Sequence, residues 1–310
     1  QQSNLTSYGI TAVVIITLEA SAGMWINAFL VCVLCMSWLK NKTLNSNEKI
    51  LLLLGCSRFW HLCTSWVYSF FSTIYPNYFF VHPVFQLVSS VQSLFNCSDL
   101  WVSASLCVLY CVKIANFRNS FFIYLKVKID RMVPWLLFGS VLFSLVISII
   151  VYNITDTALC KNLNSTCQRC IWKANIRTED HFFPIFIIAA FVTVSSFIAV
   201  IISALLLLFS LWRHKRNMQT NSMKDLSVDA HIRAMKSILS FFIIYSTNFI
   251  FVILTLIYSM TDPIHALFLF SVFLYAFPGF HSLILIFSNP KLEKTMLRIL
   301  QCVKCKVCMR

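Results

Sequence analysis

Seven long apolar stretches dominate this chain and constrain its fold more than any other feature of the sequence. A helix that crosses the hydrocarbon core of a bilayer needs about 20 mainly apolar residues, and each stretch is long enough. Continuous runs of this kind also exclude a membrane β-barrel, whose strands alternate apolar and polar residues. The stretches cover about residues 10–38, 50–74, 84–112, 132–152, 183–212, 237–259 and 264–288. The sequence therefore predicts an all-α membrane protein with a single seven-transmembrane helix bundle over residues 1–310.

The composition supports lipid rather than water as the solvent of this chain. Of its 310 residues, 59% are hydrophobic and 12% are charged, and the mean hydropathy is +0.78. A soluble domain typically has about 45–50% apolar and about 25% charged residues. Even a large soluble domain could not bury so much apolar surface, because part of its surface always faces water. A water-soluble fold is therefore excluded.

The basic residues are distributed unevenly between the connections that alternate along the chain. The first, third and fifth connections and the C-terminal segment hold 20 of the 25 lysines and arginines, the loop after the fourth stretch holds four, and Arg58 lies inside a stretch. Cytoplasmic segments of membrane proteins carry the excess of Lys and Arg. The N-terminus is therefore predicted outside and the C-terminus inside, with a short cytoplasmic helix and tail over about 290–310. This orientation requires an odd number of crossings, which seven satisfies.

A net charge of +14 would favour nucleic acid as a partner if the protein were soluble. In a membrane protein the same residues mark topology and contact the anionic headgroups of the inner leaflet. We therefore predict a multi-pass protein of the plasma membrane that contacts membrane lipid and has no nucleic-acid partner.

Three charged residues lie inside the predicted spans: Glu19 is nearer the outer surface, where it can face water, while Arg58 and Asp99 lie deeper. Counted from the nearest basic residue at the cytoplasmic end, Arg58 lies about 13 Å and Asp99 roughly 21 Å up, at about 1.5 Å per residue. An ionisable group at such a depth is costly and indicates a functional site with a partner. We hypothesise an Arg58–Asp99 ion pair in the bundle, with Asn27 and Ser282 as hydrogen-bond partners. The alternative is that each charge is hydrated separately in an internal cavity.

The sequence contains no pattern typical of catalysis. A Ser/His/Asp arrangement, an H-E-x-x-H motif and a Gly-rich phosphate loop are all missing, and the five glycines are scattered. We predict that the protein is not an enzyme and holds no cofactor or metal. Cys302, Cys305 and Cys308 lack a fourth zinc ligand, so reversible palmitoylation of the tail is the favoured interpretation.

Glycosylation is predicted on the outer side. Asn164, in the middle of the long outer loop, is the best acceptor, and Asn153 at the end of the fourth stretch is the second. The same loop holds Cys160, Cys167 and Cys170, an odd set whose pairing the sequence leaves open.

Short polar motifs recur near the predicted cytoplasmic ends of the spans. They include Leu54-Gly55-Cys56-Ser57-Arg58, the segment from Tyr110 to Phe117, the segment from Leu207 to Leu211, and the segment from His281 to Leu292. These segments resemble the L-x-x-S-R, Y-x-x-K-I-A-x-F, L-x-x-S-L and H-S-x-x-L-I-x-x-N-x-K-L elements of the vertebrate bitter taste receptor family. Two further elements, Tyr124-Leu125-Lys126 and the segment from Asp225 to Tyr245, are also similar to that family. These six elements stand in the family's order and touch five of the seven predicted spans, so the resemblance is far more specific than any single motif.

The resemblance implies a rhodopsin-like G-protein-coupled receptor. Its agonist would be a small bitter compound that enters from outside, and its partner a heterotrimeric G protein of the gustducin/Gi type. An odorant or pheromone receptor is the alternative within the receptor class. A small-molecule transporter or channel is less favoured, because the two halves show no repeat and helix-breaking Gly/Pro pairs are few.

The resemblance also assigns roles to individual residues. The residues expected to line the ligand pocket are Gln92, Ser93, Asn96, Asn248, Phe249 and Ser271, with Tyr245 at its floor. The residues expected to face the G protein are Tyr110, Lys113, Ile114, His231 and Lys236. For the polar pocket residues, an ordinary interhelical hydrogen bond is the competing interpretation.

Three positions depart from the family pattern. Gln92 stands where many relatives have Trp, Ser196 where many have Pro, and Asp99 where a small neutral residue is expected. The departure at Gln92 would change which ligands fit.

Overall fold

The computed structural model describes residues 2–115, 119–163, 179–219, 226–258 and 264–308, and these residues form helices joined by short connections. The helices are α1 (Gln2–Asn41), α2 (Ser46–Ile74), α3 (Pro76–Phe79), α4 (Val84–Ile114), α5 (Ser120–Leu163), α6 (Glu179–Gln219), α7 (Leu226–Tyr258), α8 (Ile264–Ser288) and α9 (Pro290–Cys308). The all-helical class predicted from the hydropathy is confirmed for the described residues.

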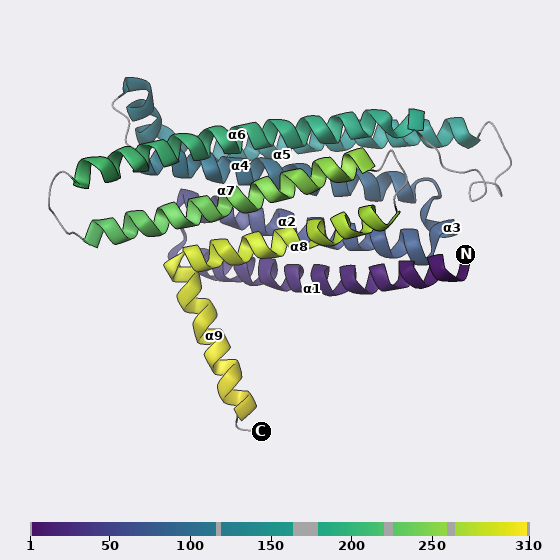
Figure 1. Cartoon of the computed structure of the whole chain (residues 1–310), viewed down its shortest axis with the longest axis horizontal. Helices are drawn as coiled ribbons and strands as arrows, with labels where there is room; N and C mark the ends of the chain where they lie inside the picture. Colours follow the sequence, from purple (N-terminus) through teal and green to yellow (C-terminus); the bar gives the residue numbers. More distant parts are fainter. Residues whose placement is uncertain (1, 116–118, 164–178, 220–225, 259–263, 309–310) are drawn as a thin grey trace.

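The long helices α1, α2 and α4 to α8 run side by side along the longest axis of the molecule (Figure 1). The N-terminus and the short helix α3 lie at one end of this bundle, here called the N-terminal end. Helix α9 leaves the opposite end at a steep angle to α8, and this end is here called the α9 end (Figure 1). Helices α2 and α4 run in opposite directions, so a residue early in α4 lies near the N-terminal end.

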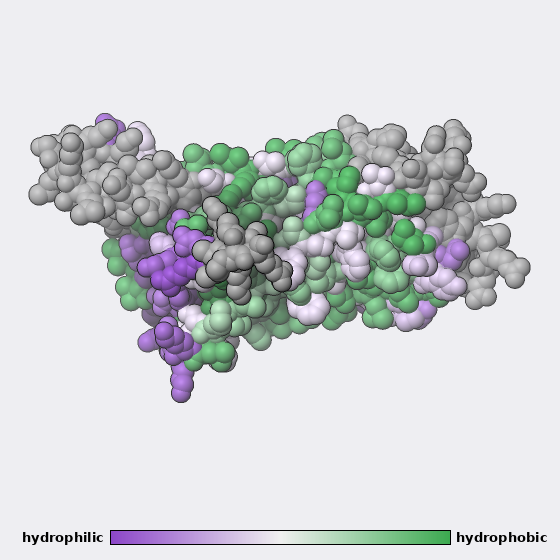
Figure 2. Space-filling view, turned by 90° about the horizontal axis from the view of Figure 1, so that it is seen from below, coloured by the Kyte–Doolittle hydropathy of each residue, from purple (hydrophilic) through white to green (hydrophobic). Residues whose placement is uncertain are grey.

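The outside of the bundle is apolar, as lipid exposure requires. Within the described residues, six helical segments are long and apolar enough to cross a membrane: Gly9–Asn41, Ser46–Ile74, Val84–Ile114, Ser120–Thr157, Pro184–Ser210 and Leu269–Ser288. The apolar segment described in α7, Phe242–Ile257, is shorter. Trp25 and Trp135 are 78% and 75% exposed, and Figure 2 shows a largely hydrophobic middle with hydrophilic residues toward the α9 end. The chain is a helical membrane bundle.

The helices extend beyond several of the apolar stretches. Helix α5 begins at Ser120, although its stretch begins only near residue 132. This first part carries Lys126, Lys128 and Arg131, which a helix tolerates once it has left the hydrocarbon region. Hydropathy alone therefore marks the membrane-buried part of α5 and misses its polar extension.

Helix α4 is the most enclosed of these segments: 72% of its most apolar part is buried, against 22–44% in the other five. Leu100, Ala104 and Cys107 contribute to a core with residues of α6 and α7, while Leu106 and Leu109 join a core with α1, α2, α5 and α8. Polar residues on α4 are therefore placed among several helices at once.

Candidate functional site

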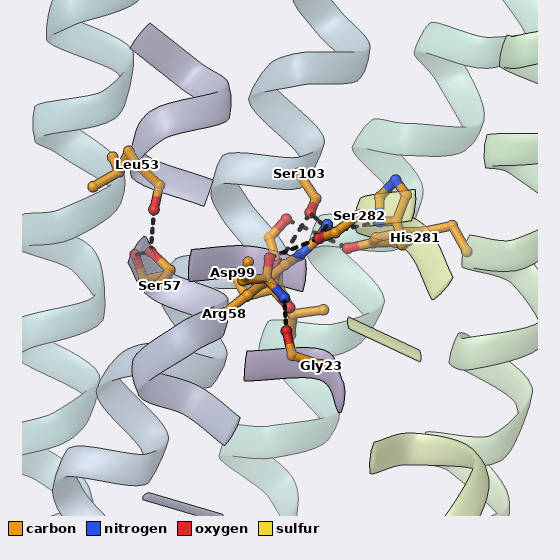
Figure 3. A network of polar contacts seen from close by, with 12 residues as sticks. Gly23, Leu53, Ser57, Arg58, Asp99, Ser103, His281 and Ser282 are labelled. Atoms are coloured by element: carbon orange, nitrogen blue, oxygen red, sulfur yellow. Dashed lines mark hydrogen bonds and ion pairs between the residues drawn. The ribbon is translucent and has the colours of Figure 1, made fainter. Parts of the chain in front are cut away.

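Arg58 and Asp99 meet in the middle of the bundle. The Nε atom of Arg58 lies 2.8 Å from Oδ1 of Asp99, and the Arg58 side chain is fully buried while that of Asp99 is 8% exposed. Arg58 stands on the inward face of α2, and Asp99 on the face of α4 that it meets (Figure 3). The two residues form an ion pair that lipid and water barely reach.

The remaining contacts of Arg58 reach α4 and α8. Its Nη1 donates to Ser282 Oγ at 2.9 Å, and its Nη2 donates to Ser103 Oγ at 3.1 Å and lies beside His281 Nδ1 (Figure 3). Because a guanidinium is only a donor, His281 Nδ1 must accept this bond, which places the proton of a neutral ring on Nε2. One carboxylate thus balances the charge of Arg58, and three neutral groups accept further hydrogen bonds from its guanidinium.

Helix α1 closes the polar network. The Ser282 hydroxyl donates to Asn27 Oδ1 at 2.7 Å, and the Asn27 amide donates to the Gly23 carbonyl at 2.8 Å. The structure therefore brings Asn27, Arg58, Asp99 and Ser282 together in one place. Their contacts join α1, α2, α4 and α8 through buried polar groups.

Two members of the network were not predicted from the sequence, Ser103 and His281. Ser103 follows Asp99 by four residues and so lies on the same face of α4, where its hydroxyl is 3.4 Å from Asp99 Oδ1. His281 directly precedes Ser282. Helical spacing could have indicated Ser103, whereas the choice of His281 depends on how α8 is rotated against α2.

The inward face of α4 changes character toward the N-terminal end. Asp99 and Ser103 are buried, but Asn96, three residues before Asp99 on the same face, is exposed. Gln92 and Ser93 are half-buried, and the Gln92 amide donates to Ser65 Oγ on α2 at 3.1 Å. On this face of α4 the side chains are therefore buried at Asp99 and Ser103 and more exposed one turn nearer the N-terminal end.

The expected residues of α7 lie against α4 and α6. Tyr245 is 2% exposed, and its hydroxyl donates to the Leu100 carbonyl at 3.3 Å. Its ring stacks on Phe197 of α6 and meets Phe277 of α8 edge to face, with centroid separations of 6.3 and 6.1 Å. The ring of Phe249 also stacks on that of Phe197, with a centroid separation of 3.9 Å. Tyr245 thus contacts three neighbouring helices.

Two further residues expected in the pocket complete this set. Asn248 is 8% exposed on α7, where it follows Tyr245 by three residues and directly precedes Phe249. Ser271 is half-buried on α8.

The residues expected to face a G protein lie at the α9 end. Lys113 Nζ is 2.7 Å from Asp130 Oδ1 on α5, and Ser46 at the start of α2 donates to the same oxygen. Tyr110 and Ile114 are half-buried in the packing around Cys111 and Ala115. The side chains of His231 and Lys236 lie outside the described part of the chain.

A second ion pair ties α9 to the bundle. Lys291 Nζ lies 2.7 Å from Glu48 Oε1 and donates to Ser37 Oγ at 2.6 Å. The other carboxylate oxygen of Glu48 accepts the backbone N–H of Asn45 at the start of α2. The first turn of α2 therefore contacts α5 through Ser46 and α9 through Glu48, and Lys291 joins α9 to α1 as well.

The predicted modification sites are only partly described. Asn153 is exposed on α5, within a continuous helix. Asn164, Cys167 and Cys170 lie outside the described residues, as do the side chains of Cys160 and of the tail cysteines. No group of His, Cys, Asp and Glu residues that could hold a metal ion occurs among the described residues.

Comparison of the sequence with known proteins identifies a family. The family model for taste receptor proteins (TAS2R) matches residues 5–304. Taste receptor type 2 member 7 of Macaca mulatta is 31% identical over 294 residues, which cover 91% of this chain and 90% of that protein. Taste receptor type 2 member 9 of Homo sapiens is 31% identical over 301 residues and 94% of each chain. Member 2 of Homo sapiens is 30% identical over 311 residues, with 98% and 99% covered. The chain therefore belongs to the taste receptor type 2 family, and it is a receptor rather than an enzyme.

Proposed function

We propose that this chain is a plasma-membrane G-protein-coupled receptor that binds small bitter compounds between its helices and activates a heterotrimeric G protein of the gustducin/Gi type. The bundle would cross the membrane seven times in the rhodopsin-like manner. The N-terminal end would face the exterior and the α9 end the cytoplasm, because the basic residues concentrate in the segments assigned to the α9 end.

The observation that carries this proposal is the contrast along the inward face of α4. Asp99 and Ser103 are committed to the buried network, whereas Asn96, one turn nearer the N-terminal end, is exposed. A ligand site needs such an opening with a few polar groups among apolar walls. We propose that the agonist binds beside Asn96, and that the Arg58 network closes this site toward the α9 end. The other residues proposed to line the site are Gln92, Ser93, Asn248, Phe249 and Ser271.

Tyr245 is proposed to transmit ligand binding to the α9 end. It is in contact with α4, α6 and α8 through Leu100, Phe197 and Phe277. A ligand that displaces Phe249 would also disturb Phe197, on which both rings stack. An agonist favours the active arrangement only by contacting it better than the resting one. We propose that the rings of Tyr245, Phe197, Phe249 and Phe277 move between the two arrangements and so change how well the agonist is contacted in each.

The G protein is proposed to engage the α9 end. Tyr110, Lys113, Ile114, His231 and Lys236 belong to the segments that end there. Other basic side chains at this end, including Lys126 and Arg131, are proposed to contact lipid headgroups, since they sit where α5 leaves the apolar region.

The test is a screen of chemically diverse bitter compounds on cells that express the chain with a gustducin-type chimeric G protein, read by calcium. We expect at least one compound to give a saturable response that disappears without the chimera. A ligand-dependent current or flux in cells lacking G proteins would contradict the proposal and favour a channel or transporter.

A further inference from the structure

One histidine inside the bundle, His61, lies close to Arg58 and Asp99 but is not one of the hydrogen-bonded members of their network. His61 follows Arg58 by three residues, so it lies one turn nearer the N-terminal end on the same side of α2. It is half-buried, whereas Arg58 and Ser57 below it are buried. His61 therefore lies at the level where the side chains of α4 become more exposed, on the side of Asp99 that faces the N-terminal end.

The surroundings of His61 leave one of its ring nitrogens unsatisfied. The ring interacts with the backbone of Gln92 on α4. Its Nδ1 atom is buried and has no hydrogen-bond partner among the residues that the structure describes. A buried polar atom without a partner costs about 1–3 kcal/mol, so such atoms are rare unless something else binds them.

The neighbouring polar groups already have partners. The Gln92 amide donates to Ser65 Oγ at 3.1 Å, and the Tyr275 hydroxyl donates to the Ser65 carbonyl at 2.7 Å. The same Tyr275 hydroxyl is hydrogen-bonded to Ser69 Oγ on α2. These contacts join α2, α4 and α8 beside His61 without using its Nδ1.

The geometry also indicates which kind of group Nδ1 would bind. In the middle of a helix the backbone N–H of Gln92 is used by the helix itself, so the group it offers to a side chain is its carbonyl. The His61 nitrogen facing that carbonyl must donate. In a neutral imidazole the other nitrogen is then an acceptor with a free lone pair. Nδ1 therefore requires a hydrogen-bond donor.

We infer that His61 Nδ1 accepts a hydrogen bond from the agonist, and that agonists of this chain present a hydroxyl or amide N–H between α2 and α4. This inference rests on the proposed function and deepens it, since it adds a residue of α2 to the pocket and names the chemistry of the ligand. His61 is a ligand-positioning residue in this scheme, and the Arg58–Asp99 pair remains outside it.

The test pairs phenols with their methyl ethers, and secondary amides with their N-methyl derivatives, as probes in the calcium assay. In the unchanged chain we expect methylation of the donor to raise the half-maximal concentration about tenfold, the cost of leaving one buried acceptor unpaired. His61→Leu and His61→Phe remove the acceptor, so the donor-bearing compounds should weaken about tenfold and the methylated ones should not. His61→Gln, whose side-chain carbonyl can accept, should restore part of the difference.

The control is Thr64→Val, one turn further along α2, whose hydroxyl donates to the Trp60 carbonyl of its own helix. It should behave like the unchanged chain, and surface staining should show equal amounts of every variant. An equal methylation effect in the unchanged chain and in His61→Leu or His61→Phe would overturn the inference. If both variants fail to reach the surface, absence of a methylation effect in the unchanged chain would overturn it.

The same screen separates this inference from the proposed function. Activation by bitter compounds of which none carries a donor would refute the role of His61 and leave the receptor function standing. No response to any compound in the presence of the chimera would refute the proposed function and the inference with it.

Discussion

At the scale of single residues, the buried charge of Arg58 determines what its neighbours must be. A guanidinium is a cation with N–H donors only, so in a membrane its surroundings must supply a counter-charge and acceptors. Asp99 supplies the charge at 2.8 Å, and Ser103, His281 and Ser282 supply the acceptors. Removing one partner of such a pair leaves an uncompensated charge, which is worse than removing both.

We expect Asp99→Asn and Arg58→Leu each to destabilise the receptor strongly, by about 3–5 kcal/mol, because each leaves one buried charge unpaired. The double variant should lose less than the sum, with a coupling of at least about 1 kcal/mol. Thermal melting of the detergent-solubilised receptor and its surface level measure both effects. Asp130→Asn, the same change at a carboxylate that is 63% exposed, is the control and should cost less than about 1 kcal/mol. Additive losses in the double variant would show that the two residues act independently.

Tyr245 allows a second residue-scale test, since its ring and its hydroxyl have different contacts. The ring packs on Phe197 and Phe277, while the hydroxyl makes a 3.3 Å bond to the Leu100 carbonyl. We expect Tyr245→Ala to abolish the agonist response with surface expression retained, and Tyr245→Phe to reduce potency only a few-fold, about the net value of one hydrogen bond. Dose–response curves normalised to surface level give the answer. An unchanged response in Tyr245→Ala would remove this residue from the signalling path.

At the scale of helices, the close approach of α1 and α8 depends on two glycines. A Cβ atom added to Gly279 would lie 3.3 Å from the Cα atom of Gly23, and that backbone atom cannot move aside as a side chain would. Small residues at such crossings let helix backbones pack closely in membranes, where no hydrophobic force draws helices together. The crossing lies beside Asn27, so it also sets the position of α1 in the polar network.

Gly279→Ala is therefore expected to lower stability by about 1–3 kcal/mol, the usual cost of overpacking a core. Gly139→Ala on α5 is the matched control, because a Cβ atom there would meet nothing within 4 Å. That variant should be neutral or more stable by up to about 1 kcal/mol, since Ala is the better helix former. Melting temperatures of the two variants should move in different directions or by clearly different amounts, and equal shifts would refute the packing argument.

At the scale of the whole molecule, topology follows from charge and the number of crossings. The N-terminus and the start of α9 lie at opposite ends of the bundle (Figure 1), as an odd number of crossings requires. Among the described residues, the α9 end carries two ion pairs between helices, Lys113–Asp130 and Lys291–Glu48. These partly exposed pairs stabilise the bundle weakly and are sensitive to salt.

We expect an epitope tag at the N-terminus to bind antibody on intact cells, and a tag at the C-terminus to bind only after permeabilisation. The physical reason is the excess of Lys and Arg in the segments at the α9 end, which resist translocation. Fluorescence on intact and permeabilised cells measures both tags, with a cytosolic protein as the control for leakage. Equal staining of both tags on intact cells would contradict the proposed orientation.

The sequence by itself determined that this chain is a helical membrane protein and a taste receptor type 2 relative. Hydropathy along a segment and short motifs are local properties, so they can be read without knowing how the helices meet. Each predicted apolar stretch accordingly lies in one long helix, to within a residue at its ends. The sequence also predicted that Arg58 and Asp99 lie at depths in the membrane from which they can meet. The depth of a residue follows from its distance in sequence from the helix end and from the rise per residue, so it can be calculated without the tertiary structure.

Tertiary structure alone decided which side chains share a site. Side-chain partners depend on how each helix is rotated about its axis. This rotation brings His281 to Arg58, Lys113 to Asp130 and Gln92 to Ser65, and it leaves Nδ1 of His61 without a partner among the described residues. That rotation is set by contacts between residues far apart in the sequence, such as Gly23 and Gly279. No pattern within one helix contains this information, because the free energy that fixes it belongs to the interfaces between helices.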